Sequence, residues 1–256
     1  MTDIHVTHNP TLKPCLGALT LLALLSCGTP EPEPRPDPPP APPTPEFEAI
    51  TNIAERKRLF FAFLEPHLQA VNQEIDEHRR LVESTLRQAT PSSPHPSLQR
   101  LAERYRVELS VSPTPELTEL YTRAEVVPLS LALAQAAHES AWGTSRFAVE
   151  GRNYFGIWCY QPGCGITPLE RTPGATHEVQ RFESVTDSVR RYAHLLNTHP
   201  AYKELRLIRA AARASGRTPR GADIAIGLSS YSERGPDYVA EIRQIIRVNR
   251  LEDSCP

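Results

Sequence analysis

The stretch Leu129–Ala148, LSLALAQAAHESAWGTSRFA, decides the fold of this 256-residue chain. Its first half consists almost entirely of small and apolar residues, and a helix that is apolar on nearly every side is normally buried in a core. Pro128 suits the first position of such a helix, and Gly143 suits the left-handed residue just past its end. We therefore expect a buried helix that begins at Pro128 and runs to the residue before Gly143.

One carboxylate, Glu139, interrupts this apolar run. Burial and the negative end of the helix dipole both disfavour the charged form of a carboxyl group in this place. A carboxyl group that keeps its proton near neutrality is what a general acid for glycoside cleavage needs, as in lysozyme. A structural glutamate paired with a buried Arg or Lys explains the same pattern equally well.

The first 26 residues have the features of an export signal. Lys13 supplies a weakly positive start, and Leu16–Leu25 is an apolar run too short for an ordinary membrane-spanning helix. The run ends in Leu-Leu-Ser-Cys, which is similar to a bacterial lipobox with Cys27 as the lipidated first residue of the mature chain. An ordinary cleaved signal peptide and an uncleaved anchor are the alternatives. All three predict export, and we expect a membrane-anchored lipoprotein of the cell envelope that faces the periplasm.

Proline dominates the segment that follows, residues 27–46. Such a segment cannot bury a core and favours an extended polyproline spacer. We predict a tether that holds a folded body away from a membrane. Beyond it we expect a helical N-terminal extension over residues 47–110 and a catalytic domain over residues 111–256.

The net charge and the cysteines bear on nucleic-acid binding, disulfide formation and metal binding. The formal net charge of −2 is no signature of nucleic-acid binding. Cys159 and Cys164 lie close together in a glycine-containing loop, which in an exported chain favours a disulfide. Zinc and free thiols are the alternatives, but no neighbouring CxxC or histidine pair completes a zinc site. We expect no metal and no cofactor, and Cys255 has no assigned partner.

Helical periodicity covers most of the remaining chain. Residues 47–88 have an apolar stripe that Pro66 is expected to break or restart. Further helices are expected at residues 99–107, 184–196, 201–214, 220–228 and about 236–250. Between them, Asn153–Phe182 is rich in glycine, proline and β-forming residues, which indicates a small β-lobe or hairpin. The chain is therefore predicted to be mainly α.

Two motifs carry a resemblance to a known family. Residues 139–145 read E-S-x-W-G-x-S, and residues 153–156 follow as N-x-F-G. Together they resemble the glucosaminidase domain of glycoside hydrolase family 73, in its Bax-like branch, and the similarity covers most of the chain after the tether. The branch is also suggested by Trp158-Cys159, by the turn at 197–202 and by Tyr-Ser-Glu-Arg-Gly at 231–235.

The resemblance implies a lysozyme-like α+β fold with a cleft beside a small β-lobe. It also implies hydrolysis of the β-1,4 bond between N-acetylglucosamine and N-acetylmuramic acid in peptidoglycan. Glu139 falls on the catalytic acid of the family and Tyr231 on its active-site tyrosine. The substrate-binding residues that we predict are Asn153, Phe155, Trp142, Trp158 and Tyr238.

The second catalytic carboxylate stays open at this point. A two-carboxylate mechanism needs a base or nucleophile across the cleft, at ~5–5.5 Å in a retaining enzyme or ~6.5–9.5 Å in an inverting one. Glu170 is favoured because it falls in the irregular hairpin region where the family has its β-lobe glutamate. Glu178 is the next candidate, followed by Glu183 and Glu233. Assistance by the acetamido group of the substrate would need no second carboxylate.

Other chemistries find less support in the sequence. His138 precedes Glu139, but no H-E-x-x-H zinc motif is present, and no GxSxG elbow surrounds Ser140. A lytic transglycosylase and a non-catalytic glycan-binding lipoprotein are the alternatives to a hydrolase. The expected partners are peptidoglycan strands and, through Cys27, a membrane, and we expect a monomer.

Overall fold

The computed structural model describes residues 44–87, 95–110, 114–171 and 174–253. The predicted signal peptide (1–26), the lipidation site Cys27, nearly all of the tether and Cys255 lie outside these residues. Within them, no helix combines the length and the apolar character that crossing a bilayer requires.

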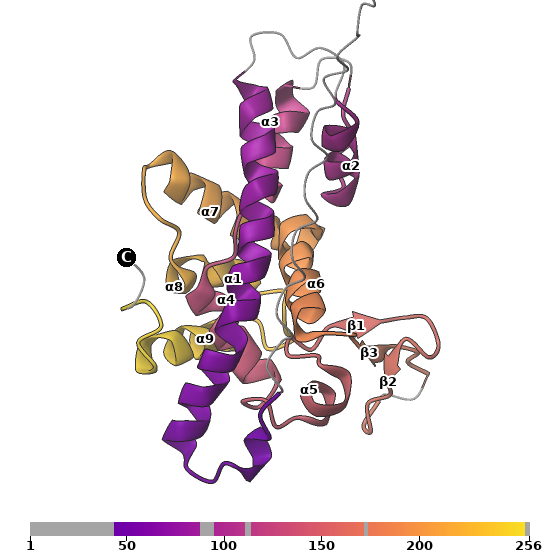
Figure 1. The fold of residues 1–256 in the computed structure, drawn as a ribbon, viewed down its shortest axis with the longest axis vertical. Coiled ribbons are helices and arrows are strands. Elements are labelled where there is room, and N and C mark those ends of the chain that lie inside the picture. Colours follow the sequence, from indigo (N-terminus) through magenta and orange to yellow (C-terminus); the bar gives the residue numbers. More distant parts are fainter. Residues whose placement is uncertain (1–43, 88–94, 111–113, 172–173, 254–256) are drawn as a thin grey trace, which may run out of the picture. The chain divides into compact units, whose positions relative to one another are not determined.

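A long helix, α1 (Ile53–Leu86), runs the length of the structure and follows the short 3₁₀ helix η1 (Phe47–Ala49) (Figure 1). Asn52 caps α1 by accepting a hydrogen bond from the backbone N–H of Glu55. The predicted break at Pro66 is wrong, because the helix continues through it. An internal proline costs about 3 kcal/mol, and burial of apolar side chains on both sides of it, such as Leu64 and Leu68, outweighs that cost.

The predicted central helix is α4 (Leu129–Glu139), and its residues 130–137 are all buried. It packs against α1, α8 (Gly221–Ile224) and α9 (Pro236–Val248). The helix ends at Glu139, four residues before Gly143, so the expected end was too late. The Ser140 hydroxyl donates to the carbonyl of Ala136 and accepts from the N–H of Gly143, replacing helical hydrogen bonds with a tight turn.

The turn after α4 has an unusual backbone. Ala141, Trp142 and Gly143 all have positive φ angles, which places three successive residues in the left-handed region. A Cβ on Gly143 would collide with the ring of Phe47, so only glycine fits beneath η1. The residues just before α1 and the turn just after Glu139 are therefore packed directly together.

Shorter helices complete the α-helical body: α2 (Pro96–Arg104), α3 (Thr114–Arg123), α5 (Arg146–Gly151), α6 (Val185–Thr198), η2 (Pro200–Tyr202), α7 (Lys203–Ala214) and η3 (Ala225–Leu228). Phe60 and Leu64 of α1 share one apolar core with Leu131 of α4 and Ile242 of α9. A second, smaller core joins α2 and α3 to the end of α1. The predicted N-terminal extension is thus packed into the body, and its boundary at residue 110 stays a prediction.

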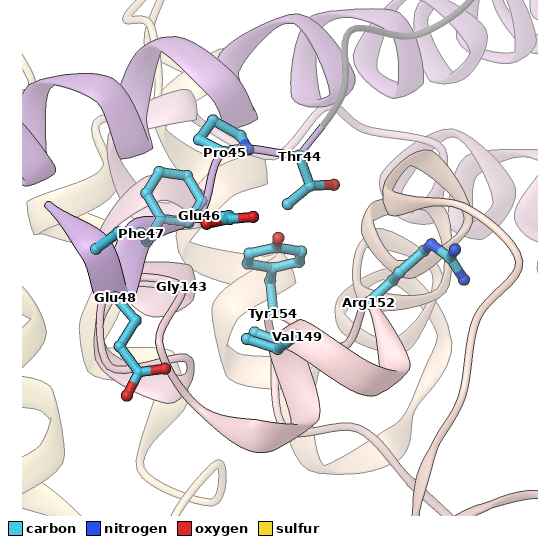
Figure 2. A pocket seen from close by; sticks show the side chains of 11 residues that line it. Thr44, Pro45, Glu46, Phe47, Glu48, Gly143, Val149, Arg152 and Tyr154 are labelled. Carbon is cyan, nitrogen blue, oxygen red and sulfur yellow. The ribbon is translucent and has the colours of Figure 1, made fainter.

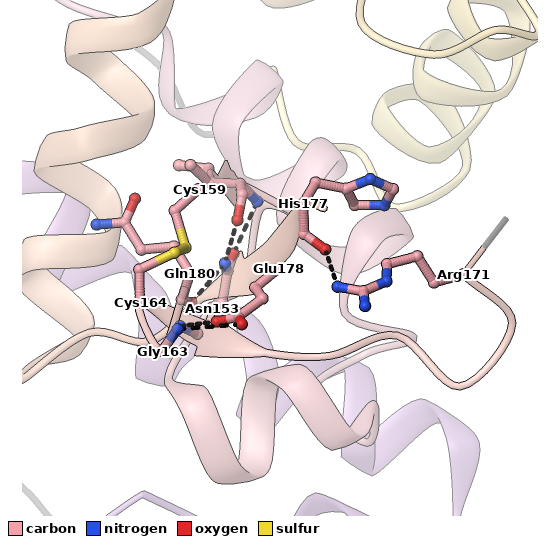
Figure 3. Close-up of a disulfide and its surroundings, with 10 residues drawn as sticks. Asn153, Cys159, Gly163, Cys164, Arg171, His177, Glu178 and Gln180 are labelled. Atoms are coloured by element: carbon pink, nitrogen blue, oxygen red, sulfur yellow. Dashed lines mark hydrogen bonds between the residues drawn. A yellow bond between two sulfur atoms is a disulfide. The ribbon is translucent and has the colours of Figure 1, made fainter. Parts of the chain in front are cut away.

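The predicted β-lobe is a three-stranded antiparallel sheet in the order β1-β3-β2, with β1 at Trp158–Cys159, β2 at Gly165–Ile166 and β3 at Glu178–Gln180. Central β3 pairs with both neighbours through Val179, opposite Trp158 and Ile166. A disulfide joins Cys159 to Cys164 at a Cα–Cα distance of 6.2 Å (Figure 3). The fold is therefore mainly α and lysozyme-like with a small β-lobe, as predicted.

Candidate active site

A cavity of about 700 Å³ lies where α4 ends. Its walls come from the end of α4, the loop that leads into β1, one face of α6 and the turn that precedes α9. The segments that carried the resemblance, residues 139–158 and 230–234, thus meet around one hollow.

Glu139 is the last residue of α4, and its side chain is 21% exposed at this cavity. Gly156 lies directly against it, because a Cβ on this glycine would be 3.1 Å from Oε2 of Glu139. The φ angle of Gly156 is +63°, a conformation that glycine adopts without steric cost. The glycine of the N-x-F-G motif therefore lets the loop approach the carboxylate closely.

Three tyrosines surround the same carboxylate. The Tyr231 hydroxyl donates to the carbonyl of Phe155 at 2.7 Å, and its ring stacks parallel to that of Tyr238, with centroids 5.6 Å apart. Tyr202 lies beside Tyr231. Burial and the neighbouring Glu139 raise the pKa of Tyr202 to about 12. Burial also raises the pKa of Tyr231 well above its ordinary value, so both phenols stay protonated as O–H donors.

His138 connects Glu139 to a charged pair at the protein surface. Its Nδ1 lies 3.4 Å from Oε1 of Glu139, and its Nε2 lies 2.9 Å from Oε2 of Glu241. Arg234, which lines the cavity, donates to both oxygens of Glu241. The nearby carboxylate of Glu139, together with the hydrogen bond to Glu241, raises the pKa of His138. Sequence reasoning missed this network, because Glu241 is 103 residues away from His138.

Within the described residues, no arginine or lysine forms an ion pair with Glu139. The alternative explanation of a structural glutamate required such a partner. Glu139 lies beside His138 instead, and the charge of a histidine can change near neutral pH.

Two of the predicted substrate-binding residues line the cavity. Phe155 is fully buried and stacks on Tyr192 at 4.0 Å, so its backbone rather than its ring meets the hollow. Trp158 is 49% exposed and stacks on His177, also at 4.0 Å. Its outer face is free to pack against a sugar ring, as exposed aromatic rings do in many binding sites.

Two others lie behind the cavity wall. The Asn153 amide donates to the carbonyls of Ile157 and Gln180, both at 2.9 Å, and its oxygen accepts from the N–H of Ile157. Tyr238 is fully buried, and its hydroxyl accepts from the amide of Gln135 at 2.8 Å. Both residues hold the wall in place, so their contact with substrate stays a prediction.

Trp142 lies on the other side of the turn from the cavity. Its ring packs edge-to-face on Phe60 and Phe61 of α1, with the Lys57 ammonium 4.6 Å from its centre. It is not among the residues that line the hollow beside Glu139. The structure therefore gives Trp142 a packing role against the N-terminal extension.

The β-lobe carboxylates do not reach the cavity in this structure. Glu178 accepts from the N–H groups of Gly163 and Gly165, at 3.1 and 2.8 Å, and these bonds lower its pKa (Figure 3). Glu170 is exposed in the β2–β3 loop, and Glu183 is exposed at the start of the segment before α6. Glu233, ranked low from sequence, lines the cavity together with Glu139.

A second cavity, of about 690 Å³, lies beside Gly143 in the turn after α4 (Figure 2). Residues 44–49, Gly143, Val149, Arg152 and Tyr154 border it, and it shares no lining residue with the cavity at Glu139. Figure 2 shows the Tyr154 hydroxyl directed toward Thr44. Glu139 thus faces only the first of these two cavities.

A carboxylate at the end of a buried helix, facing a cleft beside a small β-lobe, defines a lysozyme-like protein with a glycosidase-type site. Residues 114–251 match the family model Glucosaminidase, described as mannosyl-glycoprotein endo-beta-N-acetylglucosaminidase, and the chain belongs to this family. Protein bax of Escherichia coli (strain K12) is 30% identical over 197 residues, which cover 76% of this chain and 70% of that protein. The resemblance to the Bax-like branch is confirmed. No solved structure matches the chain.

Proposed function

We propose that this protein is a peptidoglycan hydrolase, an endo-β-N-acetylglucosaminidase that cleaves the β-1,4 bond between N-acetylglucosamine and N-acetylmuramic acid. The observation that carries the proposal is the position of Glu139, which ends a buried apolar helix and faces a cavity large enough for sugar rings. Membership of the glucosaminidase family supports glycan hydrolysis as the general activity.

In this proposal Glu139 gives its proton to the glycosidic oxygen as the bond breaks. Trp158 offers an apolar face to one sugar ring, and the phenol groups of Tyr202 and Tyr231 stay protonated beside the reacting centre. After proton transfer, a protonated His138 stabilises the carboxylate that remains on Glu139. The second half of the reaction needs a group that activates water or forms an intermediate.

For that second group we place Glu233 ahead of Glu170. Both side chains are exposed, but Glu233 lines the cavity that Glu139 faces and Glu170 does not. The acetamido group of the substrate is the alternative. The variant Glu233→Gln distinguishes catalysis by Glu233 from assistance by this group. A fall in kcat of about 10²-fold or more indicates a catalytic carboxylate, and unchanged kcat indicates substrate assistance.

The test is a digest of purified peptidoglycan by the full chain in detergent, beside Glu139→Gln, with product ends identified by borohydride reduction and mass spectrometry. New reducing N-acetylglucosamine ends that disappear in the variant are the expected result. Anhydro-muramic ends would indicate a lytic transglycosylase, and reducing muramic ends would move the cleavage to the other bond. Binding without products from either protein would indicate a non-catalytic module.

We also propose that the chain works at a membrane surface in the cell envelope, anchored through Cys27. The lipobox-like sequence before Cys27 and the proline-rich segment after it support this location. Labelled palmitate fed to expressing bacteria is expected to enter the wild-type chain and not Cys27→Ala. Equal labelling of both proteins, or labelling of neither, contradicts the anchor.

A further inference from the structure

One arginine of the cavity at Glu139 has no counter-charge. Arg191 is on the face of α6 that lines this cavity, one helical turn before Leu195, and its side chain is partly buried. Burial lowers its pKa, and the nearby Arg106 contributes to the same shift. Among the residues that the structure describes, no carboxylate forms an ion pair with it and no side-chain hydrogen bond engages its guanidinium.

Two arginines close to Arg191 have carboxylate partners. Arg190, the preceding residue, pairs with both Glu74 and Asp187. Arg234, on the opposite wall, pairs with Glu241. Withdrawing a charge from water costs free energy unless a partner repays it. An unpaired guanidinium in a substrate cavity therefore indicates that its partner arrives with the ligand.

The positive charge around Arg191 extends into the N-terminal extension. His194 lies one turn further along α6 and shares a small hollow with Arg104, at the end of α2. Burial lowers the pKa of His194 to about 4, and Arg191, Arg106 and Arg104 add to this shift. Cationic groups from α6 and from the extension thus lie near Arg191, although Arg104 and Arg106 border hollows separate from the cavity at Glu139.

Three glutamates border these two hollows. Glu74 lies in the hollow of His194 and Arg104, where it pairs with Arg190. Glu103 and Glu108 border the hollow that also contains Arg106. Within the part of the chain that the structure describes, neither of them forms an ion pair with Arg106. Both are exposed and point to solvent-accessible surface rather than to the cavity at Glu139.

We infer that Arg191 forms a subsite that binds a carboxylate carried by the muramic acid unit of the glycan, with Arg106 of the extension adding positive charge from outside the cavity. The inference rests on the proposed function and names a specificity determinant of that site. Sugar rings are neutral, so they need no arginine. Muramic acid carries a lactyl group that ends in a carboxylate when bare, or in a stem peptide with carboxylates of its own. A guanidinium binds either through paired N–H···O bonds.

Binding is measured on the Glu139→Gln background, so that the result does not depend on turnover. Three ligands are compared: peptidoglycan with its stem peptides, glycan strands stripped of peptides by an amidase, and chitohexaose, which has no carboxylate. Arg191→Gln and Arg106→Gln are the test variants. Arg217→Gln, an exposed arginine outside the cavity, is the matched control.

A charge-assisted contact predicts that Arg191→Gln weakens binding of the acidic ligands by roughly 10- to 100-fold, with a smaller loss for Arg106→Gln. Chitohexaose binding is expected to change several-fold less, and Arg217→Gln to have no effect. Loss with peptide-bearing glycan alone assigns the carboxylates of the stem peptide, and loss with stripped strands alone assigns the lactyl carboxylate. Loss with both of these ligands, but not with chitohexaose, means that the site binds either carboxylate. Equal loss with all three ligands, or no loss with any, overturns the inference. Carboxylate-selective binding by a protein that releases no products would reject only the proposed hydrolysis.

Discussion

Substitution of Gly156 by alanine tests whether the loop that touches Glu139 controls the reaction. The added methyl group would lie 3.1 Å from Oε2 of Glu139, closer than ordinary van der Waals contact. The carboxylate or the loop must therefore shift by a few tenths of an ångström. A misplacement of 1 Å can cost about 10²-fold in rate, so a shift of this size predicts a loss of roughly 3- to 10-fold in kcat/KM.

The same substitution also strains the backbone, because Gly156 has a φ of +63°. A left-handed alanine costs roughly 1–2 kcal/mol. Gly216 offers a matched control, since it has a φ of +69° and nothing within 4 Å of its hypothetical Cβ. Gly216→Ala is expected to lose similar stability, seen as a fall in Tm of about 2–8 °C, while keeping its activity.

The assay is the rate at which new reducing ends appear in soluble glycan strands, measured well below both melting temperatures. The contact with Glu139 predicts that Gly156→Ala is slower than Gly216→Ala at equal folded fraction. Equal rates for the two variants would refute the reasoning, because backbone strain alone would then explain the effect of Gly156→Ala.

Three further predictions concern stability. Glu139 and Glu241 raise the pKa of His138, so the stability that His138 adds is fully present below about pH 6.5 and is lost as pH rises through the raised pKa. In urea denaturation at several pH values, His138→Gln should therefore lower the free energy of unfolding most at low pH. A loss that does not depend on pH contradicts the network. Backbone hydrogen bonds lower the pKa of Glu178, so its contribution to the free energy of unfolding is present at neutral pH and disappears as pH falls through that lowered pKa. Glu178→Gln should therefore speed hydrogen exchange at Gly163 and Gly165 while activity persists, and loss of activity with unchanged exchange would make Glu178 catalytic. Phe47 is only 2% exposed, and its ring packs edge-to-face on Phe60 and Phe63. Phe47→Ala should therefore lower the free energy of unfolding by about 3–5 kcal/mol. A change below about 1 kcal/mol would mean that the extension is not part of the core.

The central helix and the β-lobe could be predicted because their signals are local. An almost uninterrupted apolar run forms a buried helix whatever surrounds it, and α4 does so. The glycine- and proline-rich composition of residues 153–182 rules out a long helix, and the structure has three short strands there.

Helix ends and interruptions could not be predicted because side chains distant in sequence decide them. Pro66 stays inside α1 because apolar residues before and after it pack into the common core. The helix α4 stops at Glu139 because the hydroxyl of Ser140 forms the turn and Phe47 closes over Gly143. Neither contact follows from periodicity.

The candidate site could be predicted only in part, because several of its contacts join residues that are far apart in the sequence. Glu139, Tyr231 and Trp158 lie on motifs, and all three line the cavity. Glu170 was favoured from its place in an irregular loop, but the direction of a loop depends on contacts that composition does not specify. The network of His138 and the unpaired state of Arg191 depend on neighbours far along the chain, so only the structure could reveal them.

The measurement that tests the central claim most directly is the rate of reducing-end release by Glu139→Gln, with Glu204→Gln as an exposed carboxylate outside the cavity for comparison. Loss of a general acid predicts a fall of roughly 10²- to 10⁴-fold in kcat, with Tm and glycan binding retained, and a wild-type rate for the control. A Glu139→Gln variant that kept more than about a tenth of the wild-type rate would contradict the account, since a general acid supplies more than that.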